Sequence, residues 1–341
     1  MPYYLYKLKF TTPVRFGIDK ASSNLTTTAF TANADTLFSA ICNEWVRIFG
    51  VEGLEGLVSL AKDGNFLVSD LFPYRNIVDG EGNTQDCEIY MPKPAIMVER
   101  DLDSVNSKVD SVSKKKLKKM THVDIGRIDD YLRFLKSGGD MSFGMDRDLI
   151  YSEEQNVRVS KTYGEEPLPY QVAAVRFKKD AGLCFIAKLG DETKDKLDIV
   201  MDSLSTTGIG GKRTSGFGKF QLDDKKQEIS ENSHAFKSYG KLGKMLGKDG
   251  NVYISLSCIV PGEDELGAIL NGDSYYQLIL RKGFIYSGNY SNTNIKRKQL
   301  AMLKAGACLS EPVEGSIPDV ATDGGHSVYR YGKAMFLGVT I

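Results

Sequence analysis

A glycine-rich segment at residues 205–220, with the sequence STTGIGGKRTSGFGKF, constrains this chain more than any other stretch. Upstream of it, four apolar residues recur at the three- and four-residue spacing of a helix. They are Leu197, Val200, Met201 and Leu204. Downstream, a strand-like run passes through Phe220 and Leu222. The sequence therefore predicts that the segment is a loop that connects a helix to a strand.

The composition of this loop favours phosphate binding. Glycine has no Cβ and adopts positive φ at little cost, so the N–H groups of such a loop can converge on an anion. Lys212 and Arg213 add charge, and the hydroxyls of Thr214 and Ser215 add donors. A flexible turn is the usual outcome for a glycine cluster, but interleaved cations make it the weaker interpretation. The five glycines are Gly208, Gly210, Gly211, Gly216 and Gly218.

Spacing excludes two familiar nucleotide-binding loops. A P-loop built on the Gly211–Lys212 pair requires glycine where Thr206 stands. It also requires serine or threonine where Arg213 stands. A dinucleotide fingerprint that starts at Gly208 would need its third glycine at Arg213, and it would follow a strand and open a helix. Here a helix precedes the loop and a strand follows it.

The charge balance restricts how the chain can meet a polyanion. The 341 residues contain 44 Lys and Arg and 44 Asp and Glu, so the formal net charge is zero, with a pI of about 6.8. Proteins that bind nucleic acid through bulk charge carry an excess of cations. Any polyanion site in this chain must therefore be local. The hydrophobic content of 41% supports a substantial core, and the length suits two domains.

The cysteines and the apolar runs bear on cofactors and location. The five cysteines are isolated, without Cys-x-x-Cys or Cys/His metal spacing, so we expect reduced packing residues and no cofactor or metal. They are Cys42, Cys87, Cys184, Cys258 and Cys308. No apolar run approaches the ~18 residues of a membrane span, and the N-terminus lacks a signal-peptide pattern. We expect a cytoplasmic protein with no membrane partner.

The first part of the chain predicts a strand followed by a helix. Residues 6–10 alternate between apolar side chains and lysines, which is typical of a strand with one apolar and one basic face. A helical stripe follows at residues 35–49. Asn33 or Asp35 can cap this helix, and Gly50 can end it.

Further elements complete the order β, α, β, β, α, β. Residues 172–177 and 183–189 flank a turn and predict a hairpin. A helix near residues 197–204, the glycine loop and a strand near residues 217–222 follow. This is the order of the ferredoxin-like unit, which is also the scaffold of RNA-recognition motifs. A long polar insertion at about residues 51–169 would interrupt it between the first helix and the second strand.

The remainder of the chain predicts a second domain. Strand-like runs resume after the charged stretch at residues 223–233. They lie at residues 252–258, 276–280 and 328–336. We predict an α+β fold with two ferredoxin-like (RRM-like) domains, residues 1–230 and residues 231–341, of which the second is smaller and degenerate. Within the insertion, the lysines at residues 114–119 are most simply a solvated or mobile basic loop.

Four stretches of the chain resemble the RAMP superfamily, the ferredoxin-like RNA-binding proteins of CRISPR systems. The loop GIGGKRTSGFGKF resembles the signature of the superfamily as a whole. The stretches KLKFTTPVRFG, FTANADTLFSAICNEW and HSVYRYGKAMFLG narrow the resemblance to the subunit family that caps the 5′ end of the guide RNA in type III-A (Csm) effector complexes. The runs from Asp35 to Ala40 and from Tyr329 to Gly332 make this narrower match specific.

The resemblance implies a part in a ribonucleoprotein for antiviral defence. It implies that the chain holds the repeat-derived 5′ handle of the guide RNA. It also implies that the chain bridges the large polymerase-like subunit to the filament-forming RAMP backbone subunit, without nuclease activity of its own. Some RAMP proteins carry a histidine after the first strand, whereas this chain has Val14, Arg15, Phe16 and Gly17 there. Histidine-based cleavage at that position is therefore not expected.

The predicted RNA site combines cations with an aromatic residue, because single-stranded RNA is held through its phosphates and by stacking of its bases. Residues 157–166 resemble the thumb that RAMP proteins insert into the guide RNA. An exposed hairpin strand, and for Arg15 a plain surface cation, are the alternatives. The predicted RNA-binding residues are Arg15, Lys20, Arg158, Lys161, Tyr163, Gly208, Gly210, Gly211, Lys212, Arg213, Thr214, Ser215, Gly216 and Gly218.

The histidines favour a protein without catalytic activity. Metal-independent RNA cleavage needs a base near the 2′-OH and an acid near the leaving oxygen. His122, His234 and His326 are the three histidines, none is paired in sequence, and we expect each to be a surface or hydrogen-bonding residue. We therefore predict a non-enzyme. A guide-RNA-processing endoribonuclease of ferredoxin-like fold, and a scaffold whose loop contacts only protein, remain the alternatives.

Overall fold

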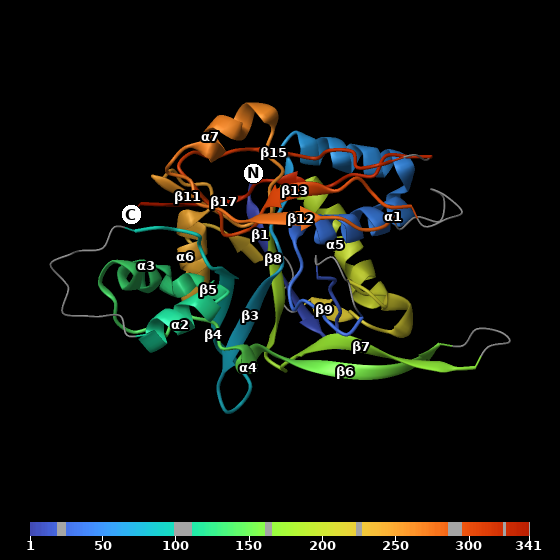
Figure 1. The fold of residues 1–341 in the computed structure, drawn as a ribbon, viewed down its shortest axis with the longest axis horizontal. Helices are drawn as coiled ribbons and strands as arrows, with labels where there is room; N and C mark the ends of the chain where they lie inside the picture. The colour runs from blue at the N-terminus through green and yellow to red at the C-terminus, as the bar shows by residue number, and fades with distance from the viewer. Residues whose placement is uncertain are drawn as a thin grey trace.

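The computed structural model describes residues 1–18, 25–98, 111–160, 166–222, 227–285, 295–322 and 325–340. Within them, the centre is an antiparallel sheet of eight strands (Figure 1). Its order is β10, β1, β8, β3, β4, β5, while β2 also pairs with β8 and β9 with β1. The strands are β1 Tyr3–Phe10, β2 Phe66–Val68, β3 Phe72–Val78, β4 Thr84–Pro92, β5 His122–Asp124, β8 Ala181–Leu189, β9 Phe220–Leu222 and β10 Gln227–Ile229.

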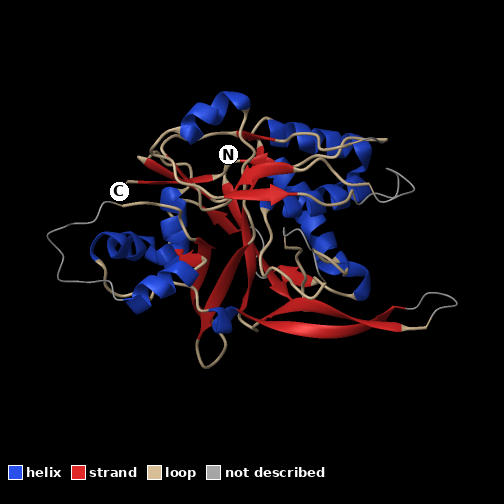
Figure 2. Cartoon of the chain, in the orientation of Figure 1, coloured by secondary structure: helices blue, strands red, loops and turns tan. Residues whose placement is uncertain are grey.

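Helices cover both faces of this sheet (Figure 2). Helices α1 and α5 contribute to one core cluster, and α3 and α6 contribute to the other. The helices are α1 Ala34–Lys62, α2 Ser111–Lys119, α3 Ile128–Ser137, α4 Arg147–Ile150, α5 Asp191–Thr207, α6 Lys237–Met245 and α7 Leu266–Leu270, with short 3-10 turns η2 Ile125–Arg127, η3 Arg213–Ser215 and η4 Glu263–Glu265. The sheet therefore forms a central layer between two helical layers.

Strand β1 is consequently buried on both faces. Tyr6 belongs to the cluster on the α1 side, and Leu5 belongs to the cluster on the α3 side. Lys7 is only 3% exposed, its Nζ donates to Asn76 Oδ1 at 3.2 Å, and it lies 5.1 Å from the centre of the Tyr74 ring. The predicted basic face of this strand is therefore wrong at Lys7, because the second core cluster covers that face.

Helix α1 confirms its predicted start and corrects its predicted end. Asn33 is the N-cap residue, but the N–H of Ala34 donates to Asp70 Oδ1 at 2.7 Å rather than to a side chain of the cap. Gly50 breaks the helix with φ of 74°, as predicted, and the helix then resumes and continues to Lys62. The start of the predicted insertion is therefore helical.

The predicted hairpin of residues 172–177 with residues 183–189 is wrong in its pairing. Strand β7 (Leu168–Phe177) pairs along its whole length with β6 (Tyr151–Ser160), and the two form a hairpin that projects from the body (Figure 1). Strand β8 instead pairs with β1, β2 and β3. It is buried along nearly its whole length and has strands on both edges: β1 on one, and β2 and β3, which come from the predicted insertion, on the other.

The C-terminal part builds three smaller sheets on the same core. Its strands are β11 Val252–Ser255, β12 Leu278–Arg281, β13 Leu300–Leu303, β14 Cys308–Leu309, β15 Gly315–Ser316, β16 Gly332–Lys333 and β17 Phe336–Val339. Strand β11 lies between β14 and β17, while β12 pairs with β13 and β15 with β16. The α+β class is confirmed. The two ferredoxin-like domains and their boundary near residue 230 stay a prediction.

Two further expectations concern lysines and cysteines. The lysines of residues 114–119 lie on α2 and are exposed, so this stretch is a helix rather than a loop. All five cysteines are free thiols; Cys42 is half-buried and the other four are buried. None of the described helices is both long enough and apolar enough to span a membrane.

Candidate nucleic-acid interface

The glycine loop, residues 208–218, connects α5 to β9 as predicted. Gly208, Gly210, Gly216 and Gly218 adopt positive φ, with values of 82°, 90°, 84° and 78°. Lys212 has φ of 61° and is the one residue other than glycine with positive φ in the described part of the chain. Such a conformation is uncommon for residues with a side chain. The loop therefore folds back on itself in a tight turn centred on Lys212.

Three of these glycines allow close packing against the protein rather than space for a ligand. A Cβ on Gly218 would lie 2.0 Å from the carbonyl oxygen of Ile209. A Cβ on Gly210 would lie 2.5 Å from the carbonyl oxygen of Arg15, and one on Gly208 would also meet backbone. Gly216 differs, because no atom lies within 4 Å of its Cβ position. Only Gly216 combines positive φ with open space above the loop.

The loop uses many of its N–H groups for its own fold. Ile209 donates to Gly218 O at 3.0 Å, and Gly218 donates to Pro13 O at 2.8 Å. Gly211 donates to Arg15 O at 2.8 Å. Within the described structure, the N–H groups that form no hydrogen bond with other protein groups include three in succession, those of residues 212–214. The expected convergence of N–H groups is therefore restricted to this short stretch.

Arg15 lies beneath the loop and is not a plain surface cation. Its side chain is 9% exposed, and its Nη2 donates to the carbonyl oxygen of Thr27 at 3.3 Å. Burial lowers the pKa of the guanidinium. The Cβ position of Gly211 is 3.5 Å from Arg15 Nη1. The sequence prediction thus brought Arg15 and the loop together correctly, although most of the Arg15 side chain is covered.

The β6–β7 hairpin contacts the loop through two pairs of a cation and an aromatic ring. The guanidinium of Arg158 lies 5.3 Å from the centre of the Phe217 ring. Lys212 Nζ lies 5.1 Å from the centre of the Tyr170 ring and 3.4 Å from its hydroxyl oxygen. Phe217 is buried in a small cluster with Val172 and other hairpin side chains. The hairpin and the loop therefore form one continuous surface.

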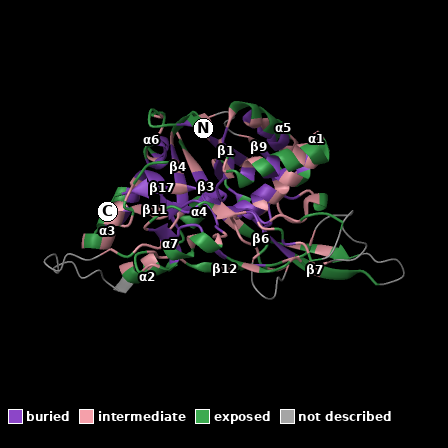
Figure 3. Ribbon diagram, turned by 90° about the horizontal axis from the view of Figure 1, so that it is seen from above, coloured by how far each residue is buried: buried purple, intermediate pink, exposed green. Residues whose placement is uncertain are grey.

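Farther along the hairpin, parts of both strands are exposed (Figure 3), and apolar residues are among the exposed ones. Val157 is 67% exposed, Val159 is 53% exposed and Leu168 is 67% exposed. Exposed β-branched and apolar residues on a projecting hairpin provide surface for a partner that the isolated chain lacks.

Most of the predicted residues therefore belong to one surface. Arg158, Lys212 and Arg213 are half-exposed on it, while Thr214 and Ser215 are exposed. Lys20, Lys161 and Tyr163 lie outside the described residues. Sequence reasoning missed Tyr170 and Phe217, which position the cations.

The histidines occupy unrelated parts of the structure. His122 on β5 is buried, and burial together with the charge of Lys304 lowers its pKa to about 3. Its Nδ1 lies 3.0 Å from Thr121 Oγ1. His234 and His326 are exposed. In the described ranges, no group of three or more His, Cys, Asp or Glu side chains is arranged to hold a metal ion.

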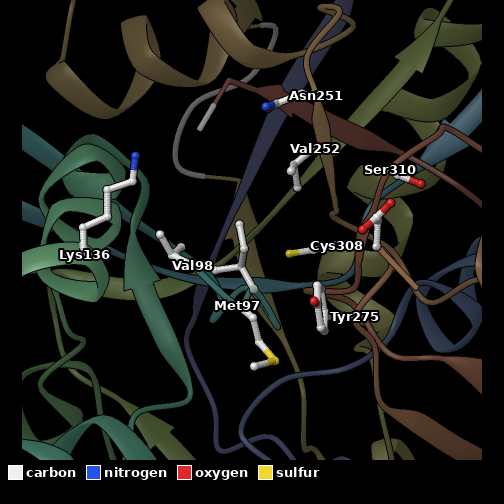
Figure 4. Close-up of a pocket in the computed structure, with 10 residues that line it drawn as sticks. Met97, Val98, Lys136, Asn251, Val252, Tyr275, Cys308 and Ser310 are labelled. Carbon is white, nitrogen blue, oxygen red and sulfur yellow. The ribbon is translucent and has the colours of Figure 1, made fainter. Parts of the chain in front are cut away.

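A cavity of about 520 Å³ lies apart from the loop, between α3 and the C-terminal strands (Figure 4). Lys136, Val252, Tyr275 and Cys308 are among the residues that line it. Burial raises the pKa of the Cys308 thiol to about 12, so the thiol stays protonated at neutral pH. None of the predicted RNA-binding residues that the structure describes lines this cavity.

Comparisons with known proteins agree with the geometry. Residues 248–339 match the family model described as the CRISPR Csm4 C-terminal domain. The chain is 26% identical over 328 residues to the "CRISPR system Cms protein Csm4" of Mycobacterium tuberculosis (strain CDC 1551 / Oshkosh), which covers 95% of this chain and 96% of the relative. It is 27% identical over 347 residues to the Csm4 of Streptococcus thermophilus, which covers 100% of both.

Solved structures share the fold. A chain of the Csm3-Csm4 subcomplex in the type III-A CRISPR-Cas interference complex matches with a TM-score of 0.60 and 16% identity over 99% of each chain. A chain of the Csm1-Csm4 cassette in complex with AMPPNP matches with a TM-score of 0.58 and 18% identity over 99% of this chain and 98% of that one.

The chain thus shares the mixed α+β fold of Csm4 subunits solved in type III-A complexes. It is also similar over nearly its whole length to Csm4 proteins, and its residues 248–339 match the Csm4 C-terminal domain.

Proposed function

We propose that this chain is a non-catalytic subunit that binds the 5′ handle of the guide RNA. It bridges the large polymerase-like subunit to the filament-forming RAMP subunit of its complex. We also propose that residues 1–230 and residues 231–341 form two ferredoxin-like domains. The elements β1, α1, β2, β8, α5 and β9 support the first of these two domains. They follow one another in a βαββαβ order within one antiparallel sheet, with β3 to β7 inserted between β2 and β8.

The observation that carries the RNA-binding proposal is the meeting of three distant segments at the glycine loop. Gly211 is hydrogen-bonded to Arg15, Arg158 stacks on Phe217, and Lys212 stacks on Tyr170. A chain with no net charge must concentrate its cations locally in order to hold a polyanion. It does so here.

The surface offers both kinds of contact that single-stranded RNA requires. Lys212 and Arg213, together with the N–H groups of residues 212–214, can donate to phosphate oxygens. The exposed side chains of Val157 and Leu168 can enter between bases, as apolar wedges do in other nucleic-acid complexes. We infer that the RNA backbone follows the loop and that the hairpin displaces bases beside it.

The proposed partners follow from the relatives. The structures that share this fold include Csm4 crystallised with Csm1 and with Csm3. We infer that this chain contacts the corresponding two subunits of its own complex. Its zero net charge suits a protein whose surface is divided between one RNA groove and mixed-charge protein interfaces.

The histidine positions support a non-catalytic role over the endoribonuclease alternative. A general base for RNA cleavage functions best with a pKa near the operating pH and within hydrogen-bonding reach of the 2′-OH. His122 is buried with a pKa of about 3, and none of the histidines belongs to the glycine loop or the hairpin.

The test is the salt dependence of binding to a labelled 5′-handle RNA. Lys212→Ala combined with Arg213→Ala should weaken binding and should reduce the slope of log K against log salt by about 0.7 for each lost phosphate contact. The control is Lys237→Ala with Lys244→Ala, which removes two exposed cations from α6 on the other side of the sheet. Unchanged affinity and slope in the loop variant would exclude the loop from the RNA site.

A further inference from the structure

A second cationic cluster lies at the first turn of α1, outside the glycine loop. Arg281 on β12 forms two hydrogen bonds with Asp35, from Nε to Oδ2 at 2.9 Å and from Nη2 to Oδ1 at 2.8 Å. Arg330 Nη1 also donates to Asp35 Oδ2. Asp35 is 4% exposed, Arg281 8% and Arg330 3%. One buried carboxylate therefore serves two buried guanidinium groups.

Among the described residues of this cluster, positive charge exceeds negative charge. Burial and the charge of nearby Arg330 lower the pKa of a third arginine, Arg297, to about 10. Burial opposes ionisation of Asp35, but Arg281 and Arg330 outweigh it and lower the pKa of Asp35. Burial raises the pKa of the neighbouring Asp70 to about 7, so it is only partly ionised at neutral pH. Among the described residues, three guanidinium groups thus lie near Asp35 and the partly ionised Asp70.

The cluster also lacks hydrogen-bond acceptors. Arg330 Nε and Arg330 Nη2 are buried, and neither has a hydrogen-bond partner in the structure as described. A buried charged donor without an acceptor is costly, and in a native protein it indicates an unseen water or ion. The charge balance favours an anion as the missing acceptor.

A short ribbon connects this cluster to the surface. Phe284 pairs with Lys296, and the N–H of Arg297 donates to Gly283 O at 3.0 Å. Arg297 Nε donates to Phe284 O at 3.1 Å, and the Arg297 side chain is half-buried. The Phe284 ring is 53% exposed beside it. The exposed lysines of the ribbon are Lys282, Lys296 and Lys298.

We propose that this ribbon and the buried Arg330 form a second phosphate-binding site, which accepts phosphate groups of single-stranded RNA. Guanidinium groups match the geometry of phosphate oxygens, and a phosphate would supply both the charge and the acceptors that the cluster lacks. The exposed Phe284 ring can stack on an adjacent base. The site stands apart from the glycine loop, so it does not depend on the function proposed for that loop.

The experiment compares the full chain with Arg297→Gln, using Lys237→Gln on α6 as the control for loss of one exposed cation. Inorganic phosphate, matched in ionic strength with chloride, should raise the melting temperature of the wild type and of the control more than that of Arg297→Gln. With a single-stranded RNA, Arg297→Gln should reduce the salt slope by about 0.7, and the loss should add to that of Lys212→Ala with Arg213→Ala.

The phosphate and RNA measurements distinguish the possible ligands. A phosphate response that Arg297→Gln removes, with RNA binding unchanged, supports the site with a free phosphate compound as its ligand. A reduced RNA salt slope in Arg297→Gln supports the RNA ligand. Loop variants that bind RNA normally, while Arg297→Gln does not, would reject the loop and retain this site. Equal phosphate response and equal RNA salt slope in wild type and in folded Arg297→Gln would overturn the proposal.

Discussion

Single residues decide whether the glycine loop can be both compact and open. Gly208, Gly210 and Gly218 are required because backbone oxygens occupy the space where a Cβ would stand. Lys212 adopts positive φ despite its side chain, and its ammonium group rests on Tyr170. Of the glycines with positive φ in the loop, Gly216 alone faces open space. Gly208, Gly210 and Gly218 therefore maintain the fold of the loop, whereas Gly216 borders its outer surface.

This separation makes Gly216→Val informative. We expect the variant to remain folded, at a cost of about 1 to 2 kcal/mol from the positive φ, and to weaken handle RNA binding because the new side chain occupies the space above the loop. Affinity measured on protein that circular dichroism shows to be folded checks this. Gly82→Val is the matched control, because Gly82 has φ of 90° and nothing near its Cβ position but lies in the β3–β4 turn. Equal affinities of the two variants would contradict the idea.

At the scale of secondary-structure elements, the sequence predicted where helices and strands lie along the chain better than it predicted which strands pair with each other. Local periodicity correctly predicted β1 and α5, whereas Gly50, which was predicted to end the first helix, only interrupts it. It could not show that β7 pairs with β6, since the pairing partner depends on which strand edges are left for β8. Nor could it show that Lys7 is buried, because the residues that contact its side chain, Tyr74 and Asn76, lie on a strand far along the chain.

The sequence likewise predicted only part of the candidate site. Its cations and glycines were visible in the sequence, because their chemistry is carried by residue type and spacing. The aromatic residues that position them, Tyr170 and Phe217, were not identified, because alternating apolar residues in a strand are equally consistent with an ordinary core. The Asp35 cluster joins residues from both ends of the chain and has no local sequence signal.

Helix α1 should act mainly as a structural element through Trp45. The Trp45 ring is 3% exposed, packs against Phe66, and its Nε1–H donates to Gly53 O at 3.0 Å across the break in the helix. Trp45→Ala should lower the free energy of unfolding by roughly 3 to 5 kcal/mol, the range for large aromatic truncations in cores. Ile48→Ala, at a 38% exposed position of the same helix, should change it little. Denaturant unfolding measures both, and similar small losses would mean that Trp45 contributes little to the core.

At the scale of the whole molecule, one core joins the N-terminal sheet to the C-terminal strands. The N–H of Val68 donates to the Tyr331 hydroxyl oxygen at 2.8 Å, and Asp70 accepts from the N–H groups of Ala34 and Cys258. Both core clusters contain residues from the two parts of the chain. The glycine loop and the Asp35 cluster are therefore held on one framework, which would suit the proposed contacts with RNA and two protein partners.

Assembly without cleavage is the expectation at this scale. Pull-down of the chain from its native cells should recover guide RNA and the large polymerase-like subunit, and deletion of the chain should abolish stable loading of that subunit onto the RNA filament. The purified chain should leave repeat RNA uncut with or without Mg²⁺ or Mn²⁺. Robust cleavage that is lost in His122→Ala, His234→Ala or His326→Ala would establish the endoribonuclease alternative instead.

The most direct measurement of the central claim is photo-crosslinking of the chain to a guide RNA that carries its 5′ handle, followed by mapping of the crosslinked residues. We expect crosslinks from the handle to residues 208–218 and to the β6–β7 hairpin, with Tyr170 among them, and their loss in Lys212→Ala with Arg213→Ala. Crosslinks that avoid both the loop and the hairpin, or that come only from RNA outside the handle, would contradict that claim.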